Sequence, residues 1–280
     1  MWEKINKFVY SQTVLSVFLL SAVLISAIAV FGFFIIGMTP AARLAVYGAA
    51  QIILSGIVVW LMRKLGVFDA DDFRCKGTGK KLLLAWFGVV YIIVSFFISF
   101  MQIPTNGFIT PNIAYLIVVI LQSFVGTALF EELLFRGLVL KLLLRKMGRA
   151  KKGIICACVI SSVFFGLSHI SNIFAGAPVL STVSQIICAM GVGLFCAAIF
   201  VRTGKLWIPI LFHGLLDLSA QIFNAIAVVS PDTVSQNTFN PAAANIISFI
   251  LLTLFTTLPV LIAALILLRK VEPDGVLERV

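Results

Sequence analysis

Long uninterrupted apolar runs restrict most strongly what this 280-residue chain can fold into. Hydrophobic residues make up 61% of the chain and charged residues only 11%, whereas an ordinary globular domain carries about 25% charged residues. A helix of about 20 apolar residues crosses the roughly 30 Å hydrocarbon core of a bilayer. Because no water can pair with the backbone there, such segments must be helical. The sequence therefore predicts an all-α membrane protein, with one integral-membrane domain over residues 1–280.

The apolar runs predict a polytopic bundle of about eight transmembrane helices. These cover approximately residues 8–36, 43–61, 82–101, 113–140, 154–175, 180–201, 206–229 and 244–268. The first run is longer than the 7–15 apolar residues of a signal peptide. We therefore expect it to be the first span.

Lys and Arg alternate between loops that are rich in them and loops that lack them. The loops without either residue are 102–112, 171–179 and 230–243. Only Arg43 breaks this alternation. The positive-inside rule then predicts that both termini are cytoplasmic. The net charge of +10 thus reflects topology and contact with membrane lipids, and its division among loops argues against nucleic acid as a partner.

Two segments on the predicted cytoplasmic side carry most of the charge. Residues 66–81 include Asp69, Asp71 and Asp72. We interpret this cluster as a solvated loop, because basic residues follow it and the spacing is not that of an EF-hand. The helical pattern that starts at residue 113 also continues without proline through residues 141–152. This continuation is expected to be amphipathic and to project into the cytoplasm or lie at the interface.

Five ionisable side chains fall inside the predicted spans, where each costs about 3 kcal/mol on insertion scales. They are Glu131, Glu132, His169, His213 and Asp217. Chains retain such residues mainly where they face one another or a water-filled cavity. Both histidines of the chain are among them. We therefore expect a polar site between the fourth, fifth and seventh spans, open to the cytoplasm or laterally to lipid.

Helical spacing predicts different roles for the two glutamates. Glu132 and Arg136 are four residues apart, so they share a helix face and are expected to pair. Glu131 points about 100° away from Glu132 around the axis and is expected to remain free for chemistry. His213 and Asp217 are also four residues apart, so both can project toward one point.

Two chemistries fit these residues. In the first, Glu131 and a histidine activate water, while the other histidine and Asp217 stabilise an oxyanion. In the second, a divalent metal such as zinc activates the water; its candidate ligands are His169, His213, Glu131 and Asp217. No HExxH spacing requires zinc, so no cofactor is assigned. Ser168 is a weaker candidate nucleophile, because neighbouring helix positions diverge and His169 would point elsewhere.

The ionisable positions resemble the motifs of the CAAX-protease and bacteriocin-processing family (CPBP, or Abi) of intramembrane endopeptidases. The family motifs EExxxR, FxxxH and Hxxx[N/D] match Glu131-Glu132-x-x-x-Arg136, Phe165-x-x-x-His169 and His213-x-x-x-Asp217. The flanking segments FRGLVL and RTGKLWIPILFHGLLD are similar too. The resemblance covers residues 123–221.

The resemblance implies a glutamate-dependent endopeptidase that cleaves a membrane-associated peptide or protein. The implied catalytic residues are Glu131, His169, His213 and Asp217, with Glu131 and His169 acting on water and the other two on the oxyanion. The implied supporting residues are Glu132, Arg136 and Phe165. Many members carry Asn where this chain has Asp217, and an ionised Asp would repel an oxyanion. Asp217 is therefore expected either to orient His213 or to bind a metal.

Two other classes of function remain open at this point. A proton-coupled transporter could use the Glu and His residues as a relay, although no inverted repeat or paired broken helix is visible. A non-catalytic scaffold or immunity protein could retain them for structure. We expect a multi-pass protein of a bacterial plasma membrane. Neither a prenyl specificity nor an oligomeric state follows from the motifs.

The charge alternation predicts the sidedness of the loops. A cysteine introduced at Asn106 or Asn237 should react with a membrane-impermeant thiol reagent added from outside the cell, since both loops lack Lys and Arg. A cysteine introduced at Lys146 should react only after the membrane is opened. Labelling with the opposite sidedness would overturn the topology.

Overall fold

A computed structural model describes residues 2–35, 37–75, 79–101, 113–226 and 246–277, and this part is helical and contains no strand. The helices are α1 (Trp2–Ser11), α2 (Thr13–Phe34), α3 (Pro40–Lys64), α4 (Gly79–Leu82), α5 (Trp86–Met101), α6 (Ile113–Leu121), α7 (Leu129–Glu132), α8 (Lys141–Met147), α9 (Lys151–Ser168), α10 (Ser171–Phe174), α11 (Val179–Thr203), α12 (Trp207–Ile226), α13 (Ile246–Arg269) and α14 (Pro273–Leu277). Two 3₁₀ turns, η1 (Ala70–Phe73) and η2 (Leu83–Ala85), and two π-helical segments, η3 (Gln122–Ala128) and η4 (Leu133–Leu140), complete these elements.

Six of the helical stretches are long and apolar enough to cross a membrane. They are Thr13–Gly32, Pro40–Lys64, Leu83–Met101, Ile113–Met147, Lys151–Phe174 and Val179–Thr203. Two further apolar stretches, Trp207–Ile222 and Thr253–Arg269, are shorter within the described residues. The expectation of an all-α, multi-pass membrane protein is therefore confirmed. The count of eight spans stays a prediction, and the expected ends of the last two, residues 229 and 244, lie outside the described residues.

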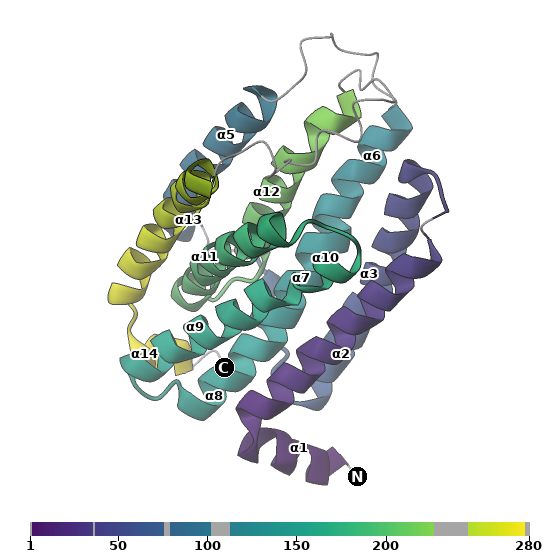
Figure 1. Cartoon of the computed structure of the whole chain (residues 1–280). Helices are drawn as coiled ribbons and strands as arrows, with labels where there is room; N and C mark the ends of the chain where they lie inside the picture. The colour runs from purple at the N-terminus through teal and green to yellow at the C-terminus, as the bar shows by residue number, and fades with distance from the viewer. Residues whose placement is uncertain (1, 36, 76–78, 102–112, 227–245, 278–280) are drawn as a thin grey trace.

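The helices form one bundle, and both chain ends lie at the same end of it, beside α1, α8 and α14 (Figure 1). The Tyr10 hydroxyl in α1 donates a hydrogen bond to the Leu65 carbonyl just after α3, at 2.9 Å. Lys151 at the start of α9 donates to the carbonyl of Arg269 at the end of α13. These bonds fix which ends of α3, α9 and α13 lie with the termini. Which side of the membrane this end faces remains a prediction.

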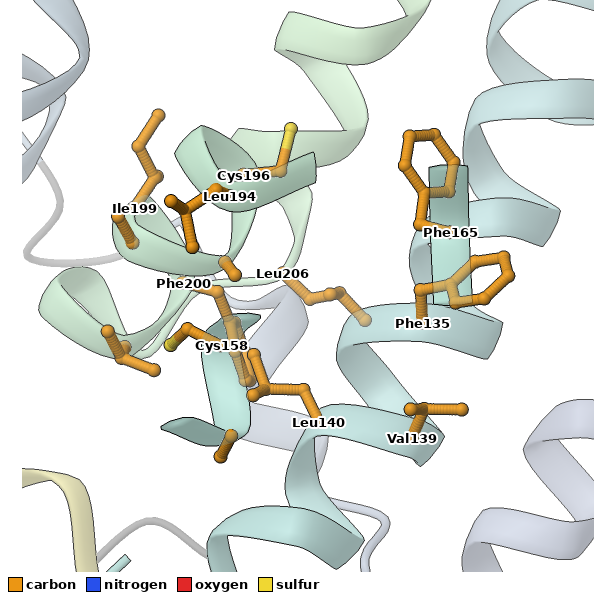
Figure 2. Packing of buried hydrophobic residues seen from close by; sticks show 14 of the residues in the cluster. Phe135, Val139, Leu140, Cys158, Phe165, Leu194, Cys196, Ile199, Phe200 and Leu206 are labelled. Atoms are coloured by element: carbon orange, nitrogen blue, oxygen red, sulfur yellow. The ribbon is translucent and has the colours of Figure 1, made fainter. Parts of the chain in front are cut away.

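Helix α11 forms the centre of the bundle and packs along α9 and α13. Its residues from Gly191 to Val201 are all buried, as expected for a helix covered on every side. Figure 2 shows side chains of α9, η4 and α11 interdigitating, including Phe135, Cys158, Phe165 and Cys196. This packed centre holds the elements that carry the candidate site.

The stretch from Ile113 to Met147 is one long helix interrupted by two π-helical segments. The π-helical segments η3 and η4 lie on either side of α7, the single α-helical turn that contains both Glu131 and Glu132. A π-helix adds a residue to a helical turn, is rare, and often occurs at functional sites. The local pitch therefore marks the position of the two glutamates within an otherwise continuous span.

The segment between α3 and α5 is not the simple solvated loop that the sequence suggested. Asp72 in η1 is buried, and its Oδ2 atom accepts a hydrogen bond from Lys141 Nζ at 2.6 Å. Lys141 is itself buried and also donates to the Val67 carbonyl at 3.2 Å. Asp71 is more exposed: its carboxylate pairs with Arg74 at 2.9 Å and lies 3.8 Å from Lys205 Nζ. The solvated interpretation is thus wrong for Asp72, because a buried lysine requires a partner.

The continuation of the long helix past residue 140 is also buried rather than projecting. Leu142, Leu143 and Leu144 are fully covered, and α8 packs against α2 and α9. The expectation of a free amphipathic extension is therefore wrong. An amphipathic pattern cannot distinguish an interfacial helix from one whose polar group is paired inside the protein.

The buried pair also connects distant parts of the bundle. The Leu206 backbone N–H donates to the Asp72 carbonyl at 2.8 Å, and Lys205 Nζ donates to the Asp71 carbonyl at 2.6 Å. Burial raises the pKa of the Asp72 carboxyl, and the charge of Lys141 opposes that rise. η1 thereby attaches α8 to the start of α12, the helix that carries His213.

Removing the Asp72 carboxylate should destabilise the protein strongly. Asp72→Ala leaves Lys141 buried without its counter-charge, a change that typically costs about 3–5 kcal/mol. The double substitution Asp72→Leu with Lys141→Met should recover most of this loss, since both charges are then removed together. Thermal unfolding in detergent measures the effect. The matched control is Asp71→Ala at the exposed pair with Arg74, worth about 0–1 kcal/mol; an equal shift in Tm for both single variants would contradict a structural role for the buried pair.

Candidate active site

A shared carboxylate oxygen connects the long helix Ile113–Met147 to α12 at the centre of the bundle. Glu132 Oε1 accepts hydrogen bonds from Arg136 Nη1 at 2.8 Å and from His213 Nδ1 at 2.8 Å. Glu132, Arg136 and His213 are all buried. The expected pair between Glu132 and Arg136 is therefore present, and it also holds His213 of α12. The sequence contained no signal for this second bond.

The Arg136 guanidinium makes two further contacts, one hydrogen bond and one with an aromatic ring. Its Nη2 atom donates to the Gly193 carbonyl of α11 at 2.9 Å, and its Cζ atom lies 4.6 Å from the centre of the Phe165 ring. A Cβ atom at position 193 would lie 2.9 Å from Phe165 and 3.2 Å from Arg136. Gly193 is therefore required by close approach, and sequence reasoning did not single it out.

Phe165 separates the two histidines and orients both rings. Its ring centre lies 5.3 Å from that of His169 and 5.6 Å from that of His213, each in an edge-to-face arrangement. Phe135 packs against the same ring at 5.2 Å (Figure 2). Edge-to-face contacts of this kind favour fixed ring orientations. This packing gives Phe165 a positioning role between the two histidines.

Glu131 faces the free nitrogen of His213. Its Oε2 atom lies 3.7 Å from His213 Nε2, and Asp217 Oδ1 lies 3.7 Å from the same nitrogen. Neither contact is a hydrogen bond at that distance. Glu131 Oε2 and Asp217 Oδ2 are buried atoms without a hydrogen-bond partner. Glu132 Oε2 also lacks a partner, but Glu132 is paired through Oε1, whereas Glu131 makes only the longer contact with His213. The expected division of roles between the two glutamates stays a prediction.

His169 lies at the C-terminus of α9, and its Nδ1 atom is 3.2 Å from the Phe165 carbonyl oxygen. A carbonyl oxygen only accepts, so this contact requires a proton on Nδ1 and leaves Nε2 as the acceptor. The Ser168 hydroxyl donates to the same carbonyl at 2.6 Å and lies 3.5 Å from Nδ1. Because Nδ1 is a donor here, this arrangement gives Ser168 no base.

Glu131 and His169 meet at a cavity of about 200 Å³ rather than in a direct hydrogen bond. The cavity is lined by α2, α3, α7 and the turn from α9 into α10. On α2 it contacts residues 25–32, near the helix end that is farther from the N-terminus, and on α3 it contacts Tyr47 and Gln51 in the first half of the helix. The cavity thus occupies the half of the bundle opposite the termini. The sequence predicted an opening toward the cytoplasm or laterally to lipid, and both stay predictions. A cavity of about 470 Å³ between α2 and α9 adjoins the catalytic cavity on its lateral side.

A polar network on α3 supports the same cavity. Gln122 Nε2, at the start of η3, donates to Gln51 Oε1 at 2.6 Å and to Thr127 Oγ1 at 3.2 Å. Gly48 and Gly126 leave room for the Gln122 amide, since a Cβ at either position would collide with it. Sequence reasoning missed this network. Its available signal was an amide side chain within an apolar span, at residue 51 and again at residue 122.

The four candidate metal ligands do not gather as a metal site. Among the residues that the structure describes, no group of three or more His, Cys, Asp or Glu side chains has an arrangement that could hold a metal ion. His213 Nδ1 is occupied by Glu132, and His169 is separated from His213 by the Phe165 ring. These residues therefore do not fit a bound zinc ion in this arrangement.

The site geometry can now be set beside known proteins. Residues 112–219, which include every motif residue of the site, match a family described as type II CAAX prenyl endopeptidase, Rce1-like. No curated protein matches the chain. The family favours a peptidase over the transporter and scaffold that the sequence left open, and it confirms the resemblance that the motifs indicated. The part of the chain that carries the candidate site is therefore similar to the Rce1-like family of type II CAAX prenyl endopeptidases.

Proposed function

We propose that this protein is an intramembrane endopeptidase that uses water activated by Glu131. The observation that carries the proposal is the position of the Glu131 carboxylate. It lines the cavity that it shares with His169, and its Oε2 atom lies 3.7 Å from His213 Nε2 without a hydrogen-bond partner. A carboxylate with a free oxygen beside two histidines is suited to general-base catalysis.

The proposed reaction begins when Glu131 takes a proton from a water molecule that His169 Nε2 helps to orient. The water oxygen bonds to the carbonyl carbon of the substrate, and the carbonyl π electrons move onto its oxygen. The C–N bond then breaks as that electron pair returns, and the proton held by Glu131 passes to the leaving amine. The complete cycle, and not any single step, returns Glu131 to its carboxylate form.

We assign stabilisation of the oxyanion to His213. Its Nδ1–H is held by Glu132, so Nε2 points toward Glu131 and Asp217 and can donate a proton there. Donors that are fixed before the reaction stabilise a developing charge most effectively. In this proposal an anionic Asp217 favours the imidazolium form of His213 by charge, and so supports the oxyanion donor indirectly at the position where many family members carry Asn.

The proposed substrate is a membrane-associated peptide or protein segment in contact with lipid. The family points to CAAX-type peptides, whose cysteine carries a prenyl group; maturation of bacteriocin-like peptides is the second process that we include. We place the protein in a bacterial plasma membrane and leave its oligomeric state unassigned. The metal-free reaction is the version we propose, because the histidines and carboxylates do not converge as ligands.

Replacing the base should abolish cleavage without unfolding the protein. Glu131→Gln should lower kcat by at least about 10², the lower limit of a general-base contribution. Glu132→Gln should instead lower folded yield and Tm, because it weakens the bonds to Arg136 and His213. Purified protein in liposomes is assayed with internally quenched peptides that end in a farnesylated CAAX sequence, beside unprenylated copies. Near-normal turnover by Glu131→Gln would refute the assignment.

The role of Asp217 can be separated from metal binding by one substitution. Asp217→Asn should retain measurable activity, because a neutral amide fits the same space and can donate to an oxyanion. Chelator should leave both wild type and variant unchanged. If chelator abolished wild-type activity and one divalent ion restored it, Asp217 would instead be a metal ligand. The Asn side chain of the Asp217→Asn variant would then weaken metal binding, because an amide is a poorer ligand than a carboxylate.

A further inference from the structure

A second cavity continues the catalytic one toward the bundle end opposite the termini. Its volume is about 340 Å³, and it is lined in part by Ile35, Arg43 and Leu44. The residues that line both cavities are Ala29, Gly32, Tyr47 and Ala175. Because four residues on three different segments border both spaces, the two cavities adjoin and give a route, or passage, from Glu131 and His169 to Arg43. A third cavity, of about 470 Å³ between α2 and α9, also adjoins the catalytic one and gives a competing lateral route that carries no charged side chain.

Arg43 is the charged residue at the outer end of this passage. It lies in the first turn of α3 and is exposed. One of its guanidinium nitrogens donates to the Met38 carbonyl at 3.3 Å, which holds the head group beside the mouth. The remainder of the lining of this cavity is apolar or aromatic. The basic residue that broke the charge alternation in the sequence is thus placed at the mouth of a passage that leads to the candidate base.

The length of the passage sets what can span it. Arg43 and Gln51 are eight residues apart on α3, about 12 Å by helical rise, and Tyr47 lies midway between them. Tyr47 and Gln51 border the same cavity as Glu131. An extended peptide covers about 3.3–3.6 Å per residue. The separation between Arg43 and the catalytic cavity therefore corresponds to about two to four peptide residues.

We propose that the peptide substrate reaches Glu131 through this passage, from the bundle end opposite the termini, and that Arg43 binds a carboxylate located about two to four residues from the scissile bond. This inference rests on the proposed peptidase function. A guanidinium pairs with a carboxylate through two parallel hydrogen bonds, which gives orientation as well as affinity. The carboxylate is that of the peptide C-terminus or of an acidic side chain.

The passage can be tested without an activity assay. Ala29 lines both cavities and is half-buried. An Ala29→Cys protein, in a background with Cys75, Cys156 and Cys188 replaced by Ala, should react with a charged, membrane-impermeant methanethiosulfonate in sealed vesicles. The reaction should occur when reagent is added on the side opposite the termini. Labelling only from the side of the termini would overturn the route.

A substitution at Gly32 should block the passage, and the same substitution at Gly56 provides a matched control. A Cβ at Gly32 meets nothing within 4 Å, so Gly32→Leu fills the passage without displacing other atoms; Gly56 on α3 is equally open but lies outside both cavities. Gly32→Leu should slow labelling of Ala29→Cys about tenfold or more and lower peptide cleavage, whereas Gly56→Leu should do neither. Equal labelling in both variants would show that the cavities are not the path.

The role of Arg43 is tested with paired peptides. In one set, quenched peptides with a free C-terminal carboxylate are compared with the same peptides as C-terminal amides. In a second set, a Glu placed two to four residues from the cleaved bond, on either side of it, is compared with Gln at the same position. Wild type should prefer one acidic form about tenfold or more through KM, the size expected for a charge-assisted pair. Arg43→Gln should lose this preference, and Arg43→Lys should restore part of it.

The outcomes separate the inference from the function on which it rests. If Arg43→Gln keeps the wild-type preference for the acidic peptide, Arg43 serves lipid headgroups or structure, and the binding role is refuted. Suppose that wild type cleaves no peptide, while Ala29→Cys is labelled from the expected side and Gly32→Leu slows that labelling. The proposed function then fails but the passage stands. If cleavage depends on Glu131 while labelling comes from the side of the termini, the proposed function stands and the passage is refuted.

Discussion

The burial of the Glu132 carboxylate is the constraint on which the rest of the site depends. One oxygen of Glu132 accepts bonds from both Arg136 and His213, and Arg136 also donates to the Gly193 carbonyl of α11. The long helix, α12 and α11 must therefore keep their relative positions. Breaking a buried charge pair by removing one partner typically costs about 3–5 kcal/mol. The bridge also fixes which nitrogen of His213 faces Glu131. A single buried charge therefore sets both the packing of the bundle centre and the orientation of the candidate oxyanion donor.

The pitch of the long helix explains how two adjacent glutamates come to serve different purposes. Glu131 and Glu132 occupy the one α-helical turn between η3 and η4. Their side chains consequently diverge: Glu132 turns toward Arg136 and α12, and Glu131 faces the cavity beside α3. The amide network of Gln51 and Gln122 holds η3 against α3 on that side. Polar bonds inside the membrane thus fix the direction of the catalytic side chain.

Periodicity and charge predicted the helical class, the multi-pass architecture and the motif residues, because those depend on local pattern. They did not predict how far each helix is displaced along its neighbours. His169 follows an α9 of 18 residues, about 27 Å of rise, whereas His213 lies only six residues after Trp207. The two histidines contact the same Phe165 ring because α12 begins deeper in the bundle, where η1 holds it through Asp72 and Leu206. This long-range bond has no signature in the sequence, and neither do Gly193 or the buried state of Lys141.

The direction of access follows from combining two observations of different origin. The alternation of Lys and Arg predicts that the termini are cytoplasmic, and the structure places the catalytic cavity in the opposite half of the bundle. For the proposed peptidase, these two features favour entry of the peptide from the outer face of the membrane, past Arg43. A substrate exported before cleavage satisfies this geometry, and one cleaved in the cytoplasm does not. On this proposal, the class of process that supplies the substrate is peptide export.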